Sequence, residues 1–134
     1  NTLAITADTV VSIDGNILGK PNNKQEAMQM LRTLSGKKHQ VITAVCVFTQ
    51  QKEHLFYAES EVYFKPLLDQ EIEHYIDTYQ PFDKAGSYGV QEWIGYIGIE
   101  KIVGSYYNVM GLPMSRLYHV LKTEFGFELY QNFQ

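Results

Sequence analysis

The chain has 134 residues, the usual size of one compact domain, and a hydrophobic fraction of 45% beside 19% charged residues excludes a disordered protein. The formal net charge of -4 excludes a general nucleic-acid binder, because such proteins bind mainly by neutralising phosphates with Lys and Arg. A mononucleotide site stays open, since a few lysines and a metal ion can hold one triphosphate whatever the net charge.

The start of the chain predicts a β-hairpin. An apolar run over Leu3–Thr6 ends near Asp8, and Val10–Ile13 continues as strand. Asp14-Gly15-Asn16 is a strong turn signal, after which Ile17-Leu18 returns as the second arm.

A helix is expected next. Asn22 or Asn23 can cap its first turn, and Ser35-Gly36 ends it, as a glycine after the last turn commonly does. Its apolar residues recur at helical spacing, namely Ala27, Met30, Leu31 and Leu34.

The middle of the chain predicts a long hairpin and a second helix. Val41–Thr49 and Leu55–Phe64 are rich in β-branched and aromatic residues, with a turn at Gln51-Lys52 between them. Asp69 is expected to cap a helix whose apolar face runs over Ile72–Tyr79.

The last third begins with a polar, glycine-containing loop over Pro81–Gln91. A strand region over Ile94–Val103 follows, broken by glycines, and Gly111-Leu112-Pro113 precedes a final helix that Gly126 ends. These patterns predict a single α/β domain over 1–134, with a mixed twisted sheet and flanking helices.

Asp8 and Lys20 are the first candidate site residues. A carboxylate where an apolar strand ends faces the part of an α/β sheet that usually binds ligands, although Asp8 can equally be a turn cap together with Thr9. Lys20 lies across the hairpin from Asp8 and could meet a phosphate as a point charge. Taken alone, an ordinary solvated lysine is the better interpretation of Lys20.

The loop from Asp83 to Gln91 is the most unusual segment. Its glycines allow the backbone to approach a ligand closely, and the amide of Gln91 pairs a donor with an acceptor, as needed to recognise a base edge. The alternative is a plain surface loop, but long loops of this composition are often functional.

The remaining residues with reactive or metal-binding side chains give weaker evidence of a site. The four histidines show no metal-ligand spacing, and Cys46, which has no partner for an internal disulfide, is best explained as a small core residue. With no apolar run of membrane-spanning length and no signal peptide, we expect a cytoplasmic protein without membrane or nucleic-acid polymer partners.

In their order along the chain, several of these segments resemble the Maf family of nucleoside triphosphate pyrophosphatases. Each match is weak alone, but together they span nearly the whole chain. They are Ala7-Asp8-Thr9-Val10-Val11, Gly19-Lys20-Pro21, Leu34-Ser35-Gly36-Lys37 with His39, Asp83-Lys84-Ala85-Gly86-Ser87-Tyr88-Gly89-Val90-Gln91, Gly104-Ser105-Tyr106, Asn108-Val109 and Gly111-Leu112-Pro113.

The resemblance implies a Maf/ITPase-like fold and hydrolysis of a nucleoside triphosphate to the monophosphate and pyrophosphate. Asp8 matches the catalytic aspartate, assigned as proton acceptor, and Lys20 matches a lysine of the phosphate site. Thr9 and Gln91 match positions linked to substrate choice. The loop that carries Asp83 and Lys84, also candidate substrate-binding residues, is similar to that of the branch acting on dTTP and UTP rather than on 7-methyl-GTP.

The same resemblance implies a divalent cation, Mg²⁺ or Mn²⁺, activity on some modified pyrimidine nucleotides, and a link to arrest of septum formation. Because Mg²⁺ binds through one or two carboxylates plus substrate phosphates, Asp8 could also be the metal ligand. Whether Asp8 takes a proton or holds the metal stays open. We expect a homodimer from the resemblance and from the abundance of Tyr and Phe.

One departure from the family pattern stands out. The family begins with a strand and a Ser-x-Arg-Arg loop that grips the phosphates, followed by a helix, and nothing in this chain matches them. We therefore expect the chain to start after that first strand and helix, which leaves an N-terminally incomplete domain. Two alternatives follow: a catalytically impaired remnant that binds a nucleotide or a protein partner, and a cell-division regulator acting through partners.

Overall fold

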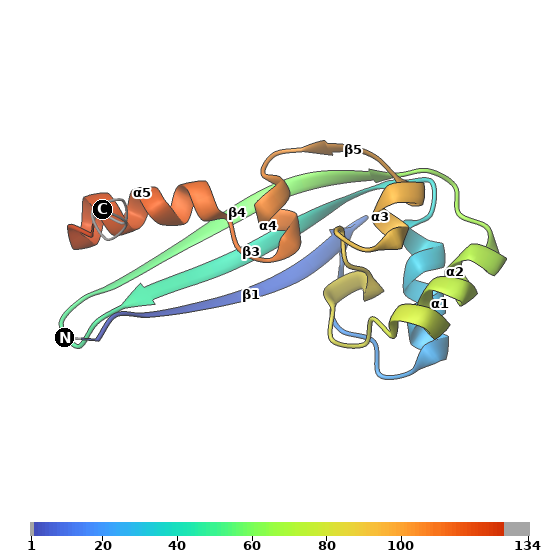
Figure 1. Cartoon of the computed structure of the whole chain (residues 1–134), viewed down its shortest axis with the longest axis horizontal. Coiled ribbons are helices and arrows are strands. Elements are labelled where there is room, and N and C mark those ends of the chain that lie inside the picture. The colour runs from blue at the N-terminus through green and yellow to red at the C-terminus, as the bar shows by residue number, and fades with distance from the viewer. Residues whose placement is uncertain (1, 128–134) are drawn as a thin grey trace.

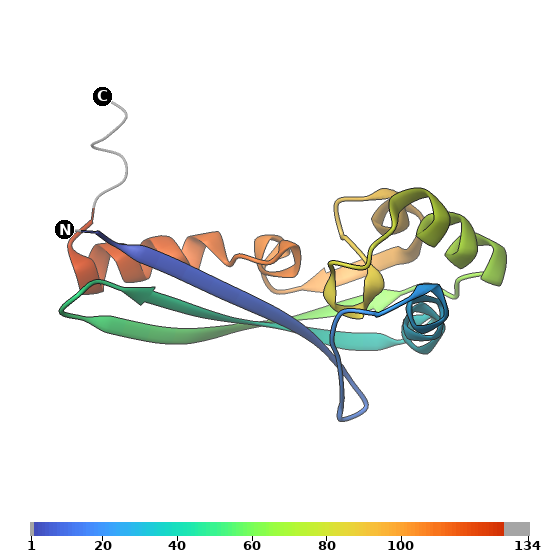
Figure 2. The same cartoon turned by 90° about the horizontal axis from the view of Figure 1, so that it is seen from below.

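The computed structural model of the chain describes residues 2–127, which form a long sheet flanked by helices (Figures 1 and 2). The strands pair in the order β2-β1-β3-β4-β5. No helix in these residues is long and apolar enough to cross a membrane. The elements in chain order are β1 (Ala4–Ile13), β2 (Asn16–Leu18), α1 (Lys24–Leu34), β3 (Lys38–Phe48), β4 (Glu53–Phe64), α2 (Asp69–Tyr79), the short 3-10 helix η1 (Ala85–Ser87), α3 (Trp93–Gly98), β5 (Ile99–Val103), α4 (Tyr106–Met110) and α5 (Met114–Phe125).

The α/β fold with flanking helices is confirmed, but the sheet within residues 2–127 is antiparallel rather than mixed. β3 pairs with β4 along its whole length, from Lys38↔Tyr63 to Phe48↔Glu53, and β1 pairs antiparallel with both β2 and β3. β4 and β5 complete the antiparallel set. The hairpins between β1 and β2 and between β3 and β4 reverse the chain direction, as does the connection from β4 to β5. The connection through α1 preserves it, but β2 and β3 lie on opposite sides of β1, so no two neighbouring strands are parallel.

Two hydrophobic cores lie at opposite ends of the sheet. α1, α2 and α3 gather at one end, α5 lies along the other, and α4 sits between them (Figure 1). The first core joins the end of β1 to α1 and α2, and includes Val11, Leu31 and Tyr75, all at most 2% exposed. The second core joins the far halves of β3 and β4 to α5, through Val45, Phe56 and Leu121 among others.

Of the two helix caps predicted from the sequence, that of α1 is confirmed and that of α2 is wrong. The Asn23 side chain accepts a hydrogen bond from the backbone N–H of Glu26 at 2.9 Å, as expected of an N-cap. The expectation for Asp69 was wrong, since Leu68 occupies the cap position and the Glu71 carboxylate accepts from its backbone N–H at 2.8 Å. Asp69 is the first helical residue instead, and its carboxylate pairs with Arg32 at 3.0 Å.

The expected strand over residues 94–103 is half wrong, because Trp93–Gly98 is helix α3 and only Ile99–Val103 is strand β5. An apolar run this short has no period that separates helix from strand. Glycine at position 95 permits the tight helical turn, because a Cβ at Gly95 would lie 2.0 Å from the carbonyl oxygen of Val90. α4 is a further helix, which was not predicted from the sequence.

Candidate active site

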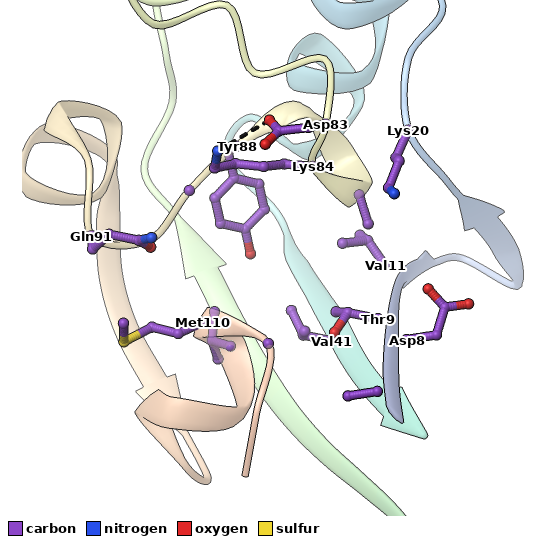
Figure 3. Close-up of a pocket in the computed structure, with 15 residues that line it drawn as sticks. Asp8, Thr9, Val11, Lys20, Val41, Asp83, Lys84, Tyr88, Gln91 and Met110 are labelled. Carbon is purple, nitrogen blue, oxygen red and sulfur yellow. Dashed lines mark hydrogen bonds and ion pairs between the residues drawn. The ribbon is translucent and has the colours of Figure 1, made fainter. Parts of the chain in front are cut away.

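One pocket of about 240 Å³ brings together all six residues singled out in the sequence. Its walls are β1, the segment after β2, the loop between α2 and α3, and the end of α4 (Figure 3). The six predicted residues that line it are Asp8, Thr9, Lys20, Asp83, Lys84 and Gln91. They come from parts of the chain more than seventy residues apart, so the tertiary fold rather than local sequence creates the cluster.

Asp8 does not stand at the end of a strand, as expected, but in the middle of β1, opposite Ala44 of β3. The strand continues because Val10, Val11 and Ile13 supply further β-branched side chains. β2 pairs only with Val11–Ile13, so on that side of Asp8 the described residues place no strand. The exposed carboxylate therefore reaches the pocket at the edge of the sheet, on the same side as the Lys20 ammonium (Figure 3).

A backbone contact ties the pocket loop to the hairpin that carries Lys20. The N–H of Gly86 donates to the carbonyl oxygen of Gly19 at 3.0 Å. Gly86 has a φ of 70°, and a Cβ there would lie 2.9 Å from a methyl of Val11. Only glycine allows both this left-handed backbone and the close approach. The loop is thus pressed against β1 next to Lys20.

Asp83 and Lys84 enter the pocket as an ion pair, with 3.1 Å between the Lys84 ammonium and a carboxylate oxygen of Asp83. The hydrogen bond from Lys84 lowers the pKa of the Asp83 carboxyl, and the charge of Lys20 contributes to the same shift. The Lys84 side chain is the better sheltered of the two, at 28% exposed against 76%. The pocket therefore presents two ammonium groups and two carboxylates within one small volume.

A buried layer of aromatic hydroxyls holds the loop from behind. The Tyr88 hydroxyl lies 2.6 Å from Nε2 of His39, which is fully buried. Burial lowers the pKa of His39 to about 4, so the imidazole is neutral at pH 7. The Tyr75 hydroxyl accepts from the backbone N–H of Gly89 at 3.0 Å and donates to the Glu92 carboxylate at 2.5 Å. Both contacts fix the backbone that leads to Gln91.

A chain of buried polar groups positions the opposite wall. The hydroxyls of Thr9 and Thr43 are 2.9 Å apart. The Asn108 amide donates to the carbonyl oxygen of Val41 at 3.2 Å and to the Ser60 hydroxyl at 2.9 Å. These bonds anchor α4 against β3 and β4, which places Val109, Met110 and Gly111 at the pocket.

Sequence reasoning missed this wall and the buried pair behind the loop. His39 and Asn108 stood among the segments that carry the family resemblance, but neither received a role. One local signal was present, since Ser105 caps α4 by accepting from the backbone N–H of Asn108 at 3.2 Å. The contacts of the Asn108 side chain join strands that are distant in sequence, and no local pattern reveals them.

Comparison with known proteins shows the family to which this chain is similar. A family described as Maf-like protein matches residues 1–124. The dTTP/UTP pyrophosphatase of Porphyromonas gingivalis strain W83 is 58% identical over 126 residues, which cover 94% of this chain and 63% of that protein. The proteins of the same name from Bacteroides thetaiotaomicron and Cytophaga hutchinsonii are 58% and 48% identical over 90% and 98% of this chain. The chain thus spans a little over three fifths of the length of these relatives, covering 62% and 61% of the latter two.

Proposed function

This chain belongs to the Maf family, and from that premise we propose that it is a nucleoside triphosphate pyrophosphatase that hydrolyses dTTP and UTP to the monophosphate and pyrophosphate. The observation that carries the proposal is the convergence of Asp8, Lys20, Lys84 and Gln91 on one pocket from separate segments of the chain. The name of these relatives, dTTP/UTP pyrophosphatase, supports the choice of substrate.

In the proposed reaction, water attacks the α-phosphorus of the bound triphosphate. A bond forms between the water oxygen and the α-phosphorus, while the bond from that phosphorus to the oxygen bridging to the β-phosphate breaks, and pyrophosphate leaves with that oxygen. Asp8 is the proposed acceptor of the proton that the water loses, since its carboxylate is exposed at the pocket edge. Lys20 stands on the same side and stabilises charge on the phosphates.

Lys84 is the second proposed phosphate ligand. Its ion pair with Asp83 fixes the ammonium, and the bound phosphates then compete with that carboxylate for it. Asp83 is therefore proposed to position Lys84. Thr9 and Gln91 are proposed to recognise the nucleoside, because both place an uncharged polar side chain at the pocket. The Thr9 hydroxyl is positioned by its hydrogen bond with Thr43.

The donor set fits a divalent cation held largely by the substrate. Within residues 2–127 no group of three His, Cys, Asp or Glu side chains is placed to bind a metal on its own. Mg²⁺ needs fewer protein ligands than such a group supplies, since one or two carboxylates together with substrate phosphates and waters complete its coordination. Asp8 is the proposed protein ligand for Mg²⁺ or Mn²⁺ if it does not act as the base. The bound cation would offset negative charge on the triphosphate.

The test is pyrophosphate release from dTTP, UTP, CTP and 7-methyl-GTP with Mg²⁺ or Mn²⁺. We expect turnover of dTTP and UTP, and a loss of at least about 100-fold in kcat/KM in Asp8→Asn, which keeps the size but removes the charge. Asp14→Asn is the matched control, since Asp14 is an exposed carboxylate of the same hairpin outside the pocket. Binding without turnover would instead identify a nucleotide-binding remnant, and full activity of Asp8→Asn would contradict the mechanism.

The proposal also covers assembly and location. We propose a homodimer acting on free nucleotides in the cytoplasm, where its substrates are found. Several large side chains stay exposed on the described surface, among them Leu55 at 53% and Tyr57 at 59%, and such residues commonly pack at interfaces between subunits. Light scattering after size exclusion measures the mass directly, and a mass of about 15 kDa, that of one chain of 15.4 kDa, would refute the dimer.

A further inference from the structure

The end of α4 supplies a pocket wall that the proposed reaction leaves without a role. Val109, Met110 and Gly111 line the pocket there, and none of their side chains carries a charge or a strong hydrogen-bonding group. Among the other lining segments, β1, the segment after β2 and the loop between α2 and α3 each contribute a polar side chain, and β3 contributes only Val41. An apolar wall in such a pocket indicates contact with an apolar part of the ligand.

The backbone of this wall is fixed while one of its side chains is free to adjust. Asn108 is fully buried and holds α4 to the sheet through the bonds to Val41 and Ser60. Gly111, with a φ of 121°, ends the helix, and its N–H donates to the carbonyl oxygens of Tyr107 and Asn108. The Met110 side chain is 46% exposed. A methionine in this position offers a flexible, polarisable surface on a rigid support.

The position of the wall relative to the charges tells which part of a nucleotide it meets. Figure 3 shows Met110 on the same side of the pocket as Gln91, while Asp8 and Lys20 lie on the other side. A triphosphate bound beside Lys20 leaves the base to extend toward Gln91 and Met110. A pyrimidine ring has one edge of hydrogen-bonding groups and an opposite, apolar edge formed by C5 and C6. The amide of Gln91 suits the first edge, and the thioether of Met110 suits the second.

We propose that Met110 is a specificity-determining residue that contacts the 5-position of a bound pyrimidine nucleotide. This inference rests on the proposed function and deepens it. A methyl group at C5 packs against the thioether, and in its absence the flexible side chain moves inward to contact the ring. One wall thereby accepts both 5-methyl and 5-unsubstituted bases, with a modest preference for the methylated one.

The test compares dTTP with dUTP, which differ only in the 5-methyl group. Calorimetry with their α,β-imido analogues and Mg²⁺ measures binding without cleavage of the α–β bond. Met110→Ala should reduce the preference for the dTTP analogue by about fourfold, the effect of burying one methyl group. Met110→Leu should keep most of the preference, because it retains an apolar side chain of similar volume. Met114→Ala is the matched control, a methionine 47% exposed that lies outside the pocket lining.

The outcomes separate this inference from the function on which it rests. A change of less than twofold in the binding ratio in Met110→Ala, with both analogues still bound, would overturn the role of Met110 and leave the pyrophosphatase proposal standing. A parent chain that binds neither analogue would overturn both. A selective loss of the dTTP analogue in Met110→Ala, absent from Met110→Leu and Met114→Ala, supports the contact.

Discussion

The two ends of the sheet share the long strands β3 and β4 but differ in how many segments cover them. At the end near α1, the buried core draws on β1, α1, α2, β3, β4 and the loop that carries Tyr88. At the other end a single helix, α5, covers the strands, and the residues packed at its border are only partly buried. There β4 alternates between Phe56, buried under α5 at 4% exposed, and Leu55 and Tyr57, which are more than half exposed.

The pocket lies at the border between these two regions. Its loop is fastened to the well-covered end through Gly86 and Tyr88, whereas Asp8 and Thr9 stand on the part of β1 that extends toward the other end. The larger core thus supports a site whose reacting groups lie where the helices around α1 no longer cover the sheet. Functional residues held by a rigid scaffold are common in proteins. The following predictions test how independent the two regions are, beginning with the largest effect.

Truncating a core leucine should separate the two ends most clearly. Leu31→Ala in α1 removes a side chain with 0% exposure from the larger core, and should lower the free energy of unfolding by about 2–5 kcal/mol. Leu121→Ala in α5, at 5% exposure in the smaller core, should cost about 2 kcal/mol. Urea unfolding followed by circular dichroism measures both. Equal losses with a single transition would show that the sheet unites the two cores into one cooperative unit.

The buried imidazole of His39 should make the well-covered end sensitive to acid. Its pKa falls from 6.5 to about 4 on folding, so the unfolded chain binds the proton more readily between these values. The stabilisation is complete above about pH 6.5 and is lost as the pH falls toward 4, by up to roughly 3 kcal/mol.

A comparison with His39→Gln isolates this contribution from that of the carboxylates. The variant should show a smaller drop in urea midpoint between pH 7 and 4 than the parent, because Gln does not titrate. The same drop in both proteins would exclude His39 as the acid-sensitive group of the core.

Removing the amide of Asn108 should loosen the border between the two regions. Asn108→Ala leaves the Val41 carbonyl and the Ser60 hydroxyl without this donor, at a cost of about 1–3 kcal/mol in unfolding free energy. Hydrogen exchange should rise at Tyr106–Met110 more than in α1. Unchanged protection of α4 would show that its packing, rather than the amide, holds the wall in place.

The smallest effect is expected at the cap of α1. Asn23→Ala removes the bond to the Glu26 N–H and should cost about 1 kcal/mol. Asn22→Ala serves as the control, because the Asn22 side chain contacts only the exposed Glu26 carboxylate, at 3.2 Å. Thermal unfolding of both variants measures the difference, and equal midpoints would refute the cap.

The sequence alone was sufficient for several features whose governing interactions are local. Asn23 as a cap, the helix up to Ser35, the turn at Asp14-Gly15-Asn16 and the end of α5 at Gly126 all depend on residues a few positions apart. Side-chain spacing and glycine conformation carry that information directly. Residue chemistry first singled out Asp8, Lys20 and the loop from Asp83 to Gln91, and the family resemblance then assigned expected roles to the six residues that the structure brings to one pocket.

Only the tertiary structure decided the features that depend on contacts across the sheet. α3 is a helix because Gly95 packs on the carbonyl of Val90, and Asp8 lies within a strand because β3 pairs with it along that length. Met110 reaches the pocket because Asn108 is bonded to β3 and β4. Such placements arise from packing between segments far apart in sequence, whereas the chain itself encodes the local conformations that this packing selects.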